Sequence, residues 1–379
     1  MTTDHDQNPA KKSKSKHWLL ATSRPLTLNT VVPFSEQESR HIIAALRWGS
    51  KEQQVCPKCG VQDKHYDIKS RRQWRCKHCN HTFSATSGTP FEHHKLSYKR
   101  MLMGLVSYVI NQKGISALAL SRVIGGQYRT SYVLMQKIRE VMVMGIESVN
   151  FEKLCGVVEI DGAHLSGKAR KGRTVNRPTR TDKTEVPNKY SKKAQHRDKT
   201  KYTDNPYHPN RRIVYVMREL DPQRGNGALR TVAAIIRSEN KEDILRLTKR
   251  YVQANSVIRT DELPGYKALP YEGYTHQTVN HSIEFSTNDG VNQNQAESYF
   301  SRMRRAVIGV WHRVTPKYML EYMQEIAWRE DTRKTNTLFQ LESIVSAVFS
   351  AGVSVDWVNY GRKGHGRQVD DLSKLGIVG

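Results

Sequence analysis

Three carboxylates, Asp161, Asp261 and Glu297, are the residues of this 379-residue chain best suited to catalysis. Each aspartate ends a short apolar stretch that is typical of a buried strand. Glu297 lies one turn into a predicted amphipathic helix that opens at Asn294. Carboxylate oxygens are the ligands that Mg²⁺ and Mn²⁺ prefer, and two such ions about 4 Å apart can hold both the attacking and the leaving oxygen of a phosphodiester. The sequence therefore predicts metal-dependent phosphoryl transfer.

Four cysteines form a second constellation of two Cys-x-x-Cys pairs, with sixteen residues between the pairs: Cys56, Cys59, Cys76 and Cys79. Two such pairs can close a tetrahedral site for one structural Zn²⁺ ion, whereas a redox motif would account for one pair only. We therefore predict a Cys₄ zinc ribbon over residues 55–92. A short helix within residues 31–54 precedes it, because Ser35-x-x-Glu38 is typical of a capping box.

The balance of charge indicates a polyanionic partner. The chain has 61 Lys and Arg against 36 Asp and Glu, a formal net charge of +25. Double-stranded DNA is the partner we expect. An acidic membrane is the alternative, but no apolar run approaches the roughly 18 residues of a membrane span. No signal-peptide pattern is present, so we expect the protein in the cytoplasm, associated with the nucleoid.

Two segments carry much of the positive charge. Residues 1–30 are polar and basic, and we predict a disordered arm. Residues 166–212 contain fifteen Lys or Arg, four Asp or Glu and almost no aliphatic residues, which predicts a long loop. Because this loop leaves the sheet beside Asp161, we expect it to contact DNA phosphates, although a solvated insertion is the simpler alternative. The candidate residues are Lys168, Arg170, Lys171 and Arg173.

Residues 95–148 have a helical period and predict three helices, with the turn Gly125-Gly126 before the third. A helix, a tight turn and a helix with a polar, basic face are typical of a helix-turn-helix, whose second helix enters the major groove. A three-helix bundle that binds nothing is the alternative. The candidate DNA contacts are Arg129, Ser131, Tyr132, Gln136 and Lys137.

The acids need a scaffold, and the period changes to that of strands after residue 149. Strands are predicted at Val157–Asp161, Ile213–Met217, Thr231–Ile236, Val257–Asp261 and Thr278–His281, with a helix at Lys241–Val252. This order predicts a mixed sheet covered by helices within residues 149–335. The fold class is therefore a multidomain α+β chain. Residues 336–379 form a tail with no motif that we can interpret.

The helix from Asn294 presents Asn294 and Glu297 on one face, at a spacing of three residues. Arg304 and Arg305 lie farther along this helix and His312 follows it, and all three are candidates for contact with phosphate. A solvated helix face and an ordinary packing histidine are the alternatives.

Further motifs surround these residues, and together they are specific. They are Arg47-Trp48, Phe83-Ser-Ala-Thr-Ser-Gly-Thr-Pro-Phe91, Val279-Asn-His-Ser282, Gly309-Val-Trp-His312 and Thr315-Pro-Lys317. With the cysteine pairs and the acids, they make residues 34–330 resemble prokaryotic insertion-sequence transposases. Those proteins join an N-terminal zinc ribbon to a DDE catalytic domain of the ribonuclease-H/integrase type.

The resemblance implies a ribonuclease-H-like mixed α/β catalytic domain with a basic insertion, in which Asp161, Asp261 and a third residue bind two Mg²⁺ ions (Mn²⁺ is an alternative). Glu297 is our preferred third ligand and Asn294 is the alternative. The resemblance also implies binding to terminal inverted repeats, strand cleavage by water and strand transfer by a 3′-OH. A homodimer or larger assembly would hold two DNA ends. A domesticated DNA-binding regulator that no longer cuts and a structure-specific nuclease of the same fold are the rival functions.

Overall fold

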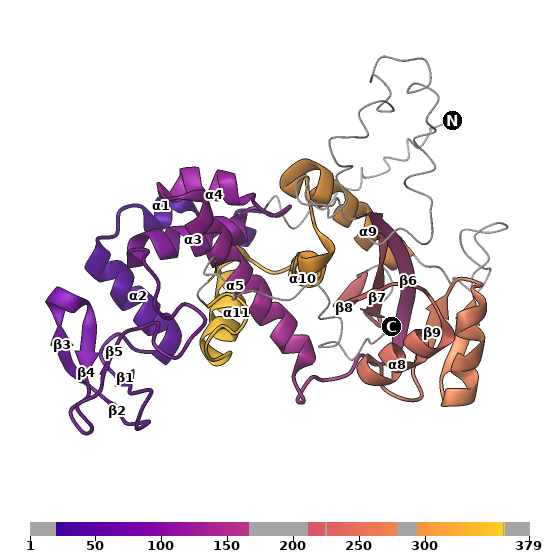
Figure 1. Cartoon of the computed structure of the whole chain (residues 1–379), viewed down its shortest axis with the longest axis horizontal. Helices are drawn as coiled ribbons and strands as arrows, with labels where there is room; N and C mark the ends of the chain where they lie inside the picture. The colour runs from indigo at the N-terminus through magenta and orange to yellow at the C-terminus, as the bar shows by residue number, and fades with distance from the viewer. Residues whose placement is uncertain (1–19, 167–210, 224–225, 279–293, 359, 361–379) are drawn as a thin grey trace, which may run out of the picture.

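The computed structural model describes residues 20–166, 211–223, 226–278, 294–358 and 360. In this part of the chain, five short strands lie at one end of an elongated molecule and a larger sheet lies at the other, with helices between them (Figure 1). No helix among the described residues is long and apolar enough to cross a membrane.

The N-terminal helix α2, Glu36–Trp48, confirms the predicted capping box. Ser35 Oγ accepts a hydrogen bond from the N–H of Glu38, whose carboxylate accepts one from the N–H of Ser35. A short helix, α1, spans Leu28–Val31 before it. Leu26 is buried, and its N–H donates to Thr337 Oγ1 at 3.1 Å. The prediction of disorder up to residue 30 is therefore wrong for this segment; residues 1–19 lie outside the described part.

The strands that carry the cysteines form two small antiparallel sheets. β1, Gln54–Val55, pairs with β2, Gln62–Asp63. β4, Gln73–Arg75, lies between β3, Tyr66–Ile68, and β5, Thr82–Phe83. The buried ring of Trp74 joins this unit to α2, because the Arg40 guanidinium lies 3.7 Å from its centroid. A 3₁₀ turn at Lys69–Arg71 connects β3 to β4, and another at Ala21–Ser23 precedes α1.

The three helices predicted between residues 97 and 145 are present as α3, Tyr98–Ile110, α4, Ala117–Ile124, and α5, Tyr128–Glu147. Gly125 ends α4 with φ +64°, a backbone conformation that favours glycine. A fourth helix, α11, Thr337–Ser350, was not predicted. Its residues Leu341, Ile344, Val345 and Val348 belong to the same buried core as α2–α5, so part of the tail returns to the N-terminal half.

The larger sheet has the order β10-β9-β6-β7-β8, and it confirms the predicted mixed sheet. Its strands are β6, Val157–Ser166, β7, Arg211–Leu220, β8, Ala228–Ile236, β9, Val257–Thr260, and β10, Thr275–Thr278. β6, β7 and β8 are antiparallel neighbours, whereas β9 is parallel to both β6 and β10. β10 overlaps the predicted fifth strand, Thr278–His281, only at Thr278, and residues 279–281 lie outside the described ranges.

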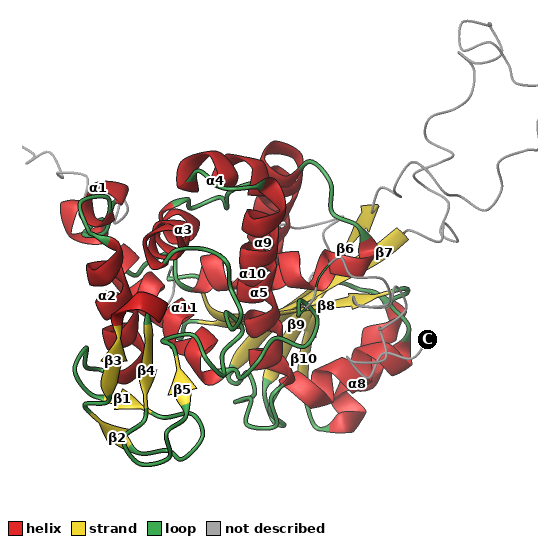
Figure 2. Cartoon of the chain, turned by 60° about the vertical axis from the view of Figure 1, so that its left-hand side comes forward, coloured by secondary structure: helices red, strands yellow, loops and turns green. Residues whose placement is uncertain are grey.

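Helices cover this sheet (Figure 2). They are α8, Lys241–Tyr251, α9, Asn294–Ala306, and α10, Met319–Asp331. Shorter helical turns occur at Pro264–Glu272, Val307–Trp311 and Pro316–Tyr318. α10 packs on β8, where Gln324 Nε2 donates to the carbonyl of Ala233 at 2.6 Å.

A buried ion-pair network also joins α10 to α5 and α3. Glu325 is fully buried and accepts from Arg139 Nε at 2.7 Å and from Arg329 Nη2 at 2.7 Å. Arg329 also donates to the carbonyls of Tyr108 and Asn111. One buried carboxylate therefore pairs with two guanidinium groups, between the N-terminal helices and the sheet.

Candidate active site and zinc centre

Asp161 and Asp261 lie on neighbouring parallel strands. β6 and β9 pair with Val157 beside Val257 and Glu159 beside Arg259. Continuing this register by two residues places Asp161 level with Asp261, and neighbouring strands lie about 4.8 Å apart. Both aspartates are partly exposed. The structure therefore brings the two predicted aspartates to the same level of the sheet.

One detail of the first strand differs from the prediction. β6 does not end at Asp161 but continues for five residues to Ser166, paired with β7 throughout. Asp161 is thus a mid-strand residue, whereas Asp261 follows the last residue of β9. The pattern of apolar residues stops at Asp161, but the pairing with β7 continues because it depends on backbone hydrogen bonds.

Glu159 positions the third element of the site. Its side chain is fully buried, and Oε2 accepts hydrogen bonds from the N–H groups of Gln295 at 2.9 Å and Ala296 at 3.1 Å. The first N–H groups of a helix have no partner within the helix, and a carboxylate there also interacts favourably with the helix dipole. Burial raises the pKa of Glu159 to about 7, although these two hydrogen bonds oppose the shift.

Arg218 also binds the start of α9. It lies opposite Glu159 on β7 and is fully buried. Its guanidinium donates to the carbonyl of Gln295 and to Thr231 Oγ1, and lies 3.6 Å from Glu330 on α10. Glu159 and Arg218 therefore both bind the start of α9 and fix it over β6 and β7.

The start of α9 presents Asn294 and Glu297 as exposed residues three positions apart. The acids are not gathered into a tight cluster. Among the described residues, the four cysteines are the one group of His, Cys, Asp or Glu whose ligand atoms all lie within 4.8 Å of one another.

Sequence reasoning missed a fourth carboxylate, Glu239. It follows the end of β8 by three residues and is partly buried. Burial, followed by the charges of Asp161 and Asp261, raises the pKa of Glu239 to about 7. Its place after a predicted strand is the same signal that identified the two aspartates, so the sequence did contain the clue.

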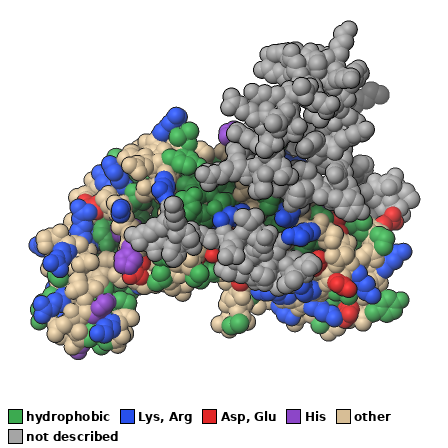
Figure 3. Space-filling view, viewed as in Figure 1, with side chains coloured by type: hydrophobic (Ala, Val, Ile, Leu, Met, Phe, Trp, Pro, Cys, Tyr) green, Lys and Arg blue, Asp and Glu red, His purple; other side chains and the backbone are tan. Residues whose placement is uncertain are grey.

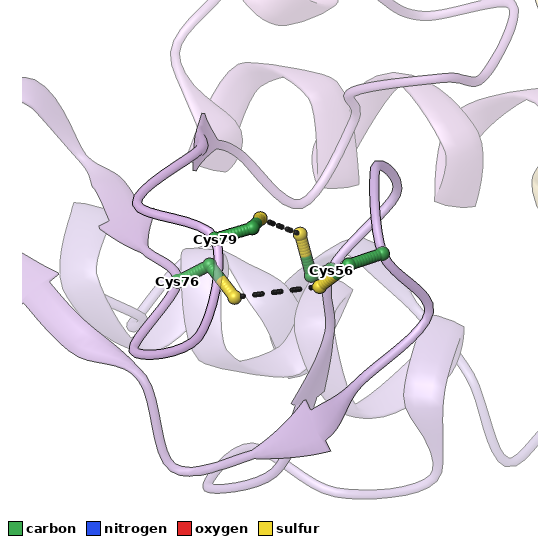
Figure 4. A group of neighbouring side chains, drawn as sticks. Cys56, Cys76 and Cys79 are labelled. Atoms are coloured by element: carbon green, nitrogen blue, oxygen red, sulfur yellow. Dashed lines mark hydrogen bonds between the residues drawn. The ribbon is translucent and has the colours of Figure 1, made fainter.

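The cysteines form a closed site between two matching loops (Figure 4). Cys56 Sγ lies 3.6 Å from Cys79 Sγ, and Cys59 Sγ lies 3.6 Å from Cys76 Sγ. A tetrahedral zinc ion with Zn–S bonds of about 2.3 Å requires sulfur atoms about 3.8 Å apart, so the donor set fits structural Zn²⁺.

The two loops are built alike. The N–H of Gly60 donates to the carbonyl of Cys56, and the N–H of Asn80 donates to that of Cys76. Both Gly60 and Asn80 have positive φ. Burial alone would raise the pKa of the Cys76 thiol, but the backbone N–H groups of Cys79 and His78 outweigh it and lower the pKa to about 6. This favours the thiolate that a metal ion requires.

The face of α5 predicted to read DNA is largely covered. Ser131 and Gln136 are fully buried, which corrects their assignment as exposed DNA contacts. Gln136 accepts from Arg139 Nη1 at 2.6 Å, and Tyr132 packs against the ring of Trp357, with 5.7 Å between centroids. Polar residues on one face of a helix can therefore form buried contacts with residues that are distant in sequence.

The remaining predicted DNA contacts have different surroundings. Arg129 is exposed and donates to the carbonyl of Tyr360 at 2.9 Å, and Lys137 is partly buried. Arg304, Arg305 and His312 are exposed. Lys and Arg side chains are spread over the visible face of the described part, with fewer acidic ones between them (Figure 3). Lys168, Arg170, Lys171 and Arg173 lie outside the described residues.

Comparison with known proteins identifies the two parts of the chain. Residues 153–331 match the ISXO2-like transposase domain, and residues 34–82 match the transposase zinc-ribbon domain. The chain is 23% identical over 274 residues to an uncharacterized protein in transposable element ISH50 of Halobacterium salinarum, which covers 72% of this chain and 83% of that protein.

Two solved structures of the Mos1 transposase show only a remote likeness. A pre-cleavage transpososome is 8% identical with a TM-score of 0.18, covering 64% of this chain and 77% of that one. A paired-end complex with the left transposon end is 8% identical with a TM-score of 0.17, covering 65% and 78%.

Proposed function

We propose that this chain, which belongs to the ISXO2-like transposases and carries their zinc-ribbon domain, cuts and joins DNA at the ends of an insertion sequence. The observation that carries the proposal is the arrangement around β6. This strand holds Asp161 level with Asp261, and through Glu159 it fixes the start of the helix that bears Glu297.

The catalytic domain in this proposal is of the ribonuclease-H type. Three antiparallel strands followed by two parallel ones support that assignment, with an acid on the central strand and another after its parallel neighbour. Asp161, Asp261 and Glu297 would hold two Mg²⁺ ions, with Asn294 as the alternative to Glu297. When bound, the ions supply activation of the attacking hydroxyl and neutralisation of charge on the leaving oxygen.

The protein's own residues orient the reaction. Glu159 and Arg218 anchor the start of α9 on β6 and β7, and we expect its first turn to lie toward the two aspartates. Arg304 and Arg305 lie farther along the same helix, exposed, where cationic groups can bind the phosphates that flank the scissile bond. Water would attack in the cleavage step and a 3′-OH in the joining step, without a covalent protein intermediate.

DNA binding in this proposal uses several surfaces. The zinc ribbon and the helix-turn-helix-like segment within residues 95–148 would bind the terminal inverted repeat, with Arg129 and Lys137 as the accessible cations of α5. Pairing of two ends would require a homodimer or a larger assembly on DNA. We place this activity in the cytoplasm, at the nucleoid.

The experiment is strand cleavage on a DNA fragment that bears the element's own end, with Mg²⁺, comparing wild type with Asp261→Asn. Cleavage and strand transfer by wild type, and neither by a variant that still binds the end, would support the proposal. End binding without cleavage by either protein would favour the non-cutting regulator. Equal cleavage by both proteins would reject the assignment of Asp261, and cutting without protection of the terminal repeat would favour a structure-specific nuclease.

A further inference from the structure

Glu239 lies near Asp161 and Asp261, and its backbone is held in place. Asn240, the next residue, is the N-cap of α8, and its side chain accepts from the N–H of Asp243 at 2.8 Å. We propose that Glu239 is an additional carboxylate ligand of the metal site formed by Asp161 and Asp261. This inference rests on the proposed function, since it deepens the same site.

A glycine beside Asp161 makes room for the Glu239 carboxylate. A Cβ atom on Gly162 would lie 1.8 Å from Glu239 Oε1, which is far inside van der Waals contact. The carboxylate therefore occupies space that exists only because residue 162 has no side chain.

The Gly162 backbone also brings Glu239 close to Asp161. Asp161 Oδ1 accepts a hydrogen bond from the N–H of Gly162 at 2.7 Å. Glu239 Oε1 takes the place of the missing Cβ of the same residue. The carboxylates of Asp161 and Glu239 therefore both lie beside Gly162.

This arrangement leaves one carboxylate oxygen without a partner. Glu239 Oε1 is buried and has no hydrogen-bond donor within the described part of the chain. Buried polar groups are nearly always satisfied, so such an oxygen beside two aspartates requires an explanation.

A bound cation supplies that explanation. Mg²⁺ and Mn²⁺ take oxygen ligands and usually keep several waters. Direct coordination of the ion by Glu239 would satisfy Oε1. A purely structural role gives no reason to bury a carboxylate oxygen without a donor beside Asp161 and Asp261.

The test is a titration of the full-length protein with Mn²⁺. Binding is measured by calorimetry and by the electron paramagnetic resonance signal of free Mn²⁺. Glu239→Gln is the test variant and Asp261→Asn the positive control. Glu242→Gln, at an exposed carboxylate in the first turn of α8, is the matched negative control. We expect Glu239→Gln to weaken Mn²⁺ binding about 10- to 100-fold and Glu242→Gln to leave it unchanged.

Thermal unfolding separates a ligand from a structural residue. Glu239→Gln should raise the Tm of the metal-free protein, because it removes an unpaired charge, and should reduce the rise in Tm that Mn²⁺ causes. Gly162→Ala offers a second route, because the added methyl group displaces an intact Glu239 and should weaken Mn²⁺ binding similarly.

The outcomes are distinct. Unchanged Mn²⁺ affinity in Glu239→Gln and Gly162→Ala, with weakened binding in Asp261→Asn, would overturn the role of Glu239 alone. A lower Tm for metal-free Glu239→Gln with the same Mn²⁺-induced rise would assign Glu239 a structural role and also overturn it. Unchanged affinity in Asp261→Asn would instead reject the metal site of the proposed function.

Discussion

Glu159 offers the sharpest test of how the fold builds the site. Its Oε2 accepts from two N–H groups at the start of α9, at 2.9 and 3.1 Å, inside the protein. Glu159→Ala leaves both donors unsatisfied. Each such loss costs about 1–3 kcal/mol, so we expect the free energy of unfolding to fall by about 2–6 kcal/mol.

Glu159→Gln separates hydrogen bonding from charge. The amide keeps an oxygen where Oε2 lies, and the NH₂ group takes the place of Oε1, which has no partner in the described structure. Only the interaction of the charge with the helix dipole is lost, worth up to about 2 kcal/mol. Burial already raises the pKa of Glu159 to about 7, so the loss near neutral pH should be smaller than this limit.

The assay combines urea unfolding with hydrogen exchange of the peptide that spans α9. Glu159→Ala should lower the free energy of unfolding and speed exchange at Gln295 and Ala296, whereas Glu159→Gln should change both much less. Glu242→Ala, at an exposed glutamate in the first turn of α8, is the matched control and should have little effect on either. Equal stability and equal exchange in Glu159→Ala and wild type would refute the anchoring role.

Three further predictions concern other parts of the chain. Glu325→Ala leaves the buried guanidiniums of Arg139 and Arg329 without their carboxylate, and urea unfolding should show a loss of about 3–5 kcal/mol; a change below the error of the measurement would contradict it. Burial raises the pKa of Asp331 from 3.8 to about 7, so the unfolded chain releases this proton first and the free energy of unfolding falls as pH rises through that window. Denaturation at pH 5 and pH 8 should show a smaller difference for Asp331→Asn than for wild type, and an identical difference would reject the assignment. A chelator should release one Zn²⁺ per chain, measured by a colorimetric assay, and lower the Tm. Cys76→Ser should lose the metal and also have a lower Tm, whereas Cys155→Ser should retain the metal.

Much of the site was predictable because its signals are local in sequence. The Cys-x-x-Cys spacing predicts the cysteine cluster, since each pair needs only one tight loop. Apolar runs that end in Asp161 and Asp261 predict strands that carry acids to one level, and the register of β6 with β9 agrees. Capping at Ser35 likewise depends on residues three positions apart.

The features that were missed depend on contacts distant in sequence. Gln136 was assigned to a face that contacts DNA, because its buried partner Arg139 and the carboxylate of Glu325, 186 residues from Arg139, come together only in the fold. The sequence gives no sign of the role of Glu159, because the helix start that it binds lies 136 residues later. The helix at Thr337–Ser350 was overlooked because its apolar residues show no clear polar face, as they pack among the N-terminal helices.

The most direct test of the central claim is anomalous diffraction from a crystal of the protein bound to its DNA end and soaked in Mn²⁺. Our account predicts two peaks about 4 Å apart, contacted by Asp161, Asp261 and a residue of the first turn of α9. The same map would decide between Glu297 and Asn294. Peaks elsewhere in the protein, with none at the edge shared by β6 and β9, would contradict the account.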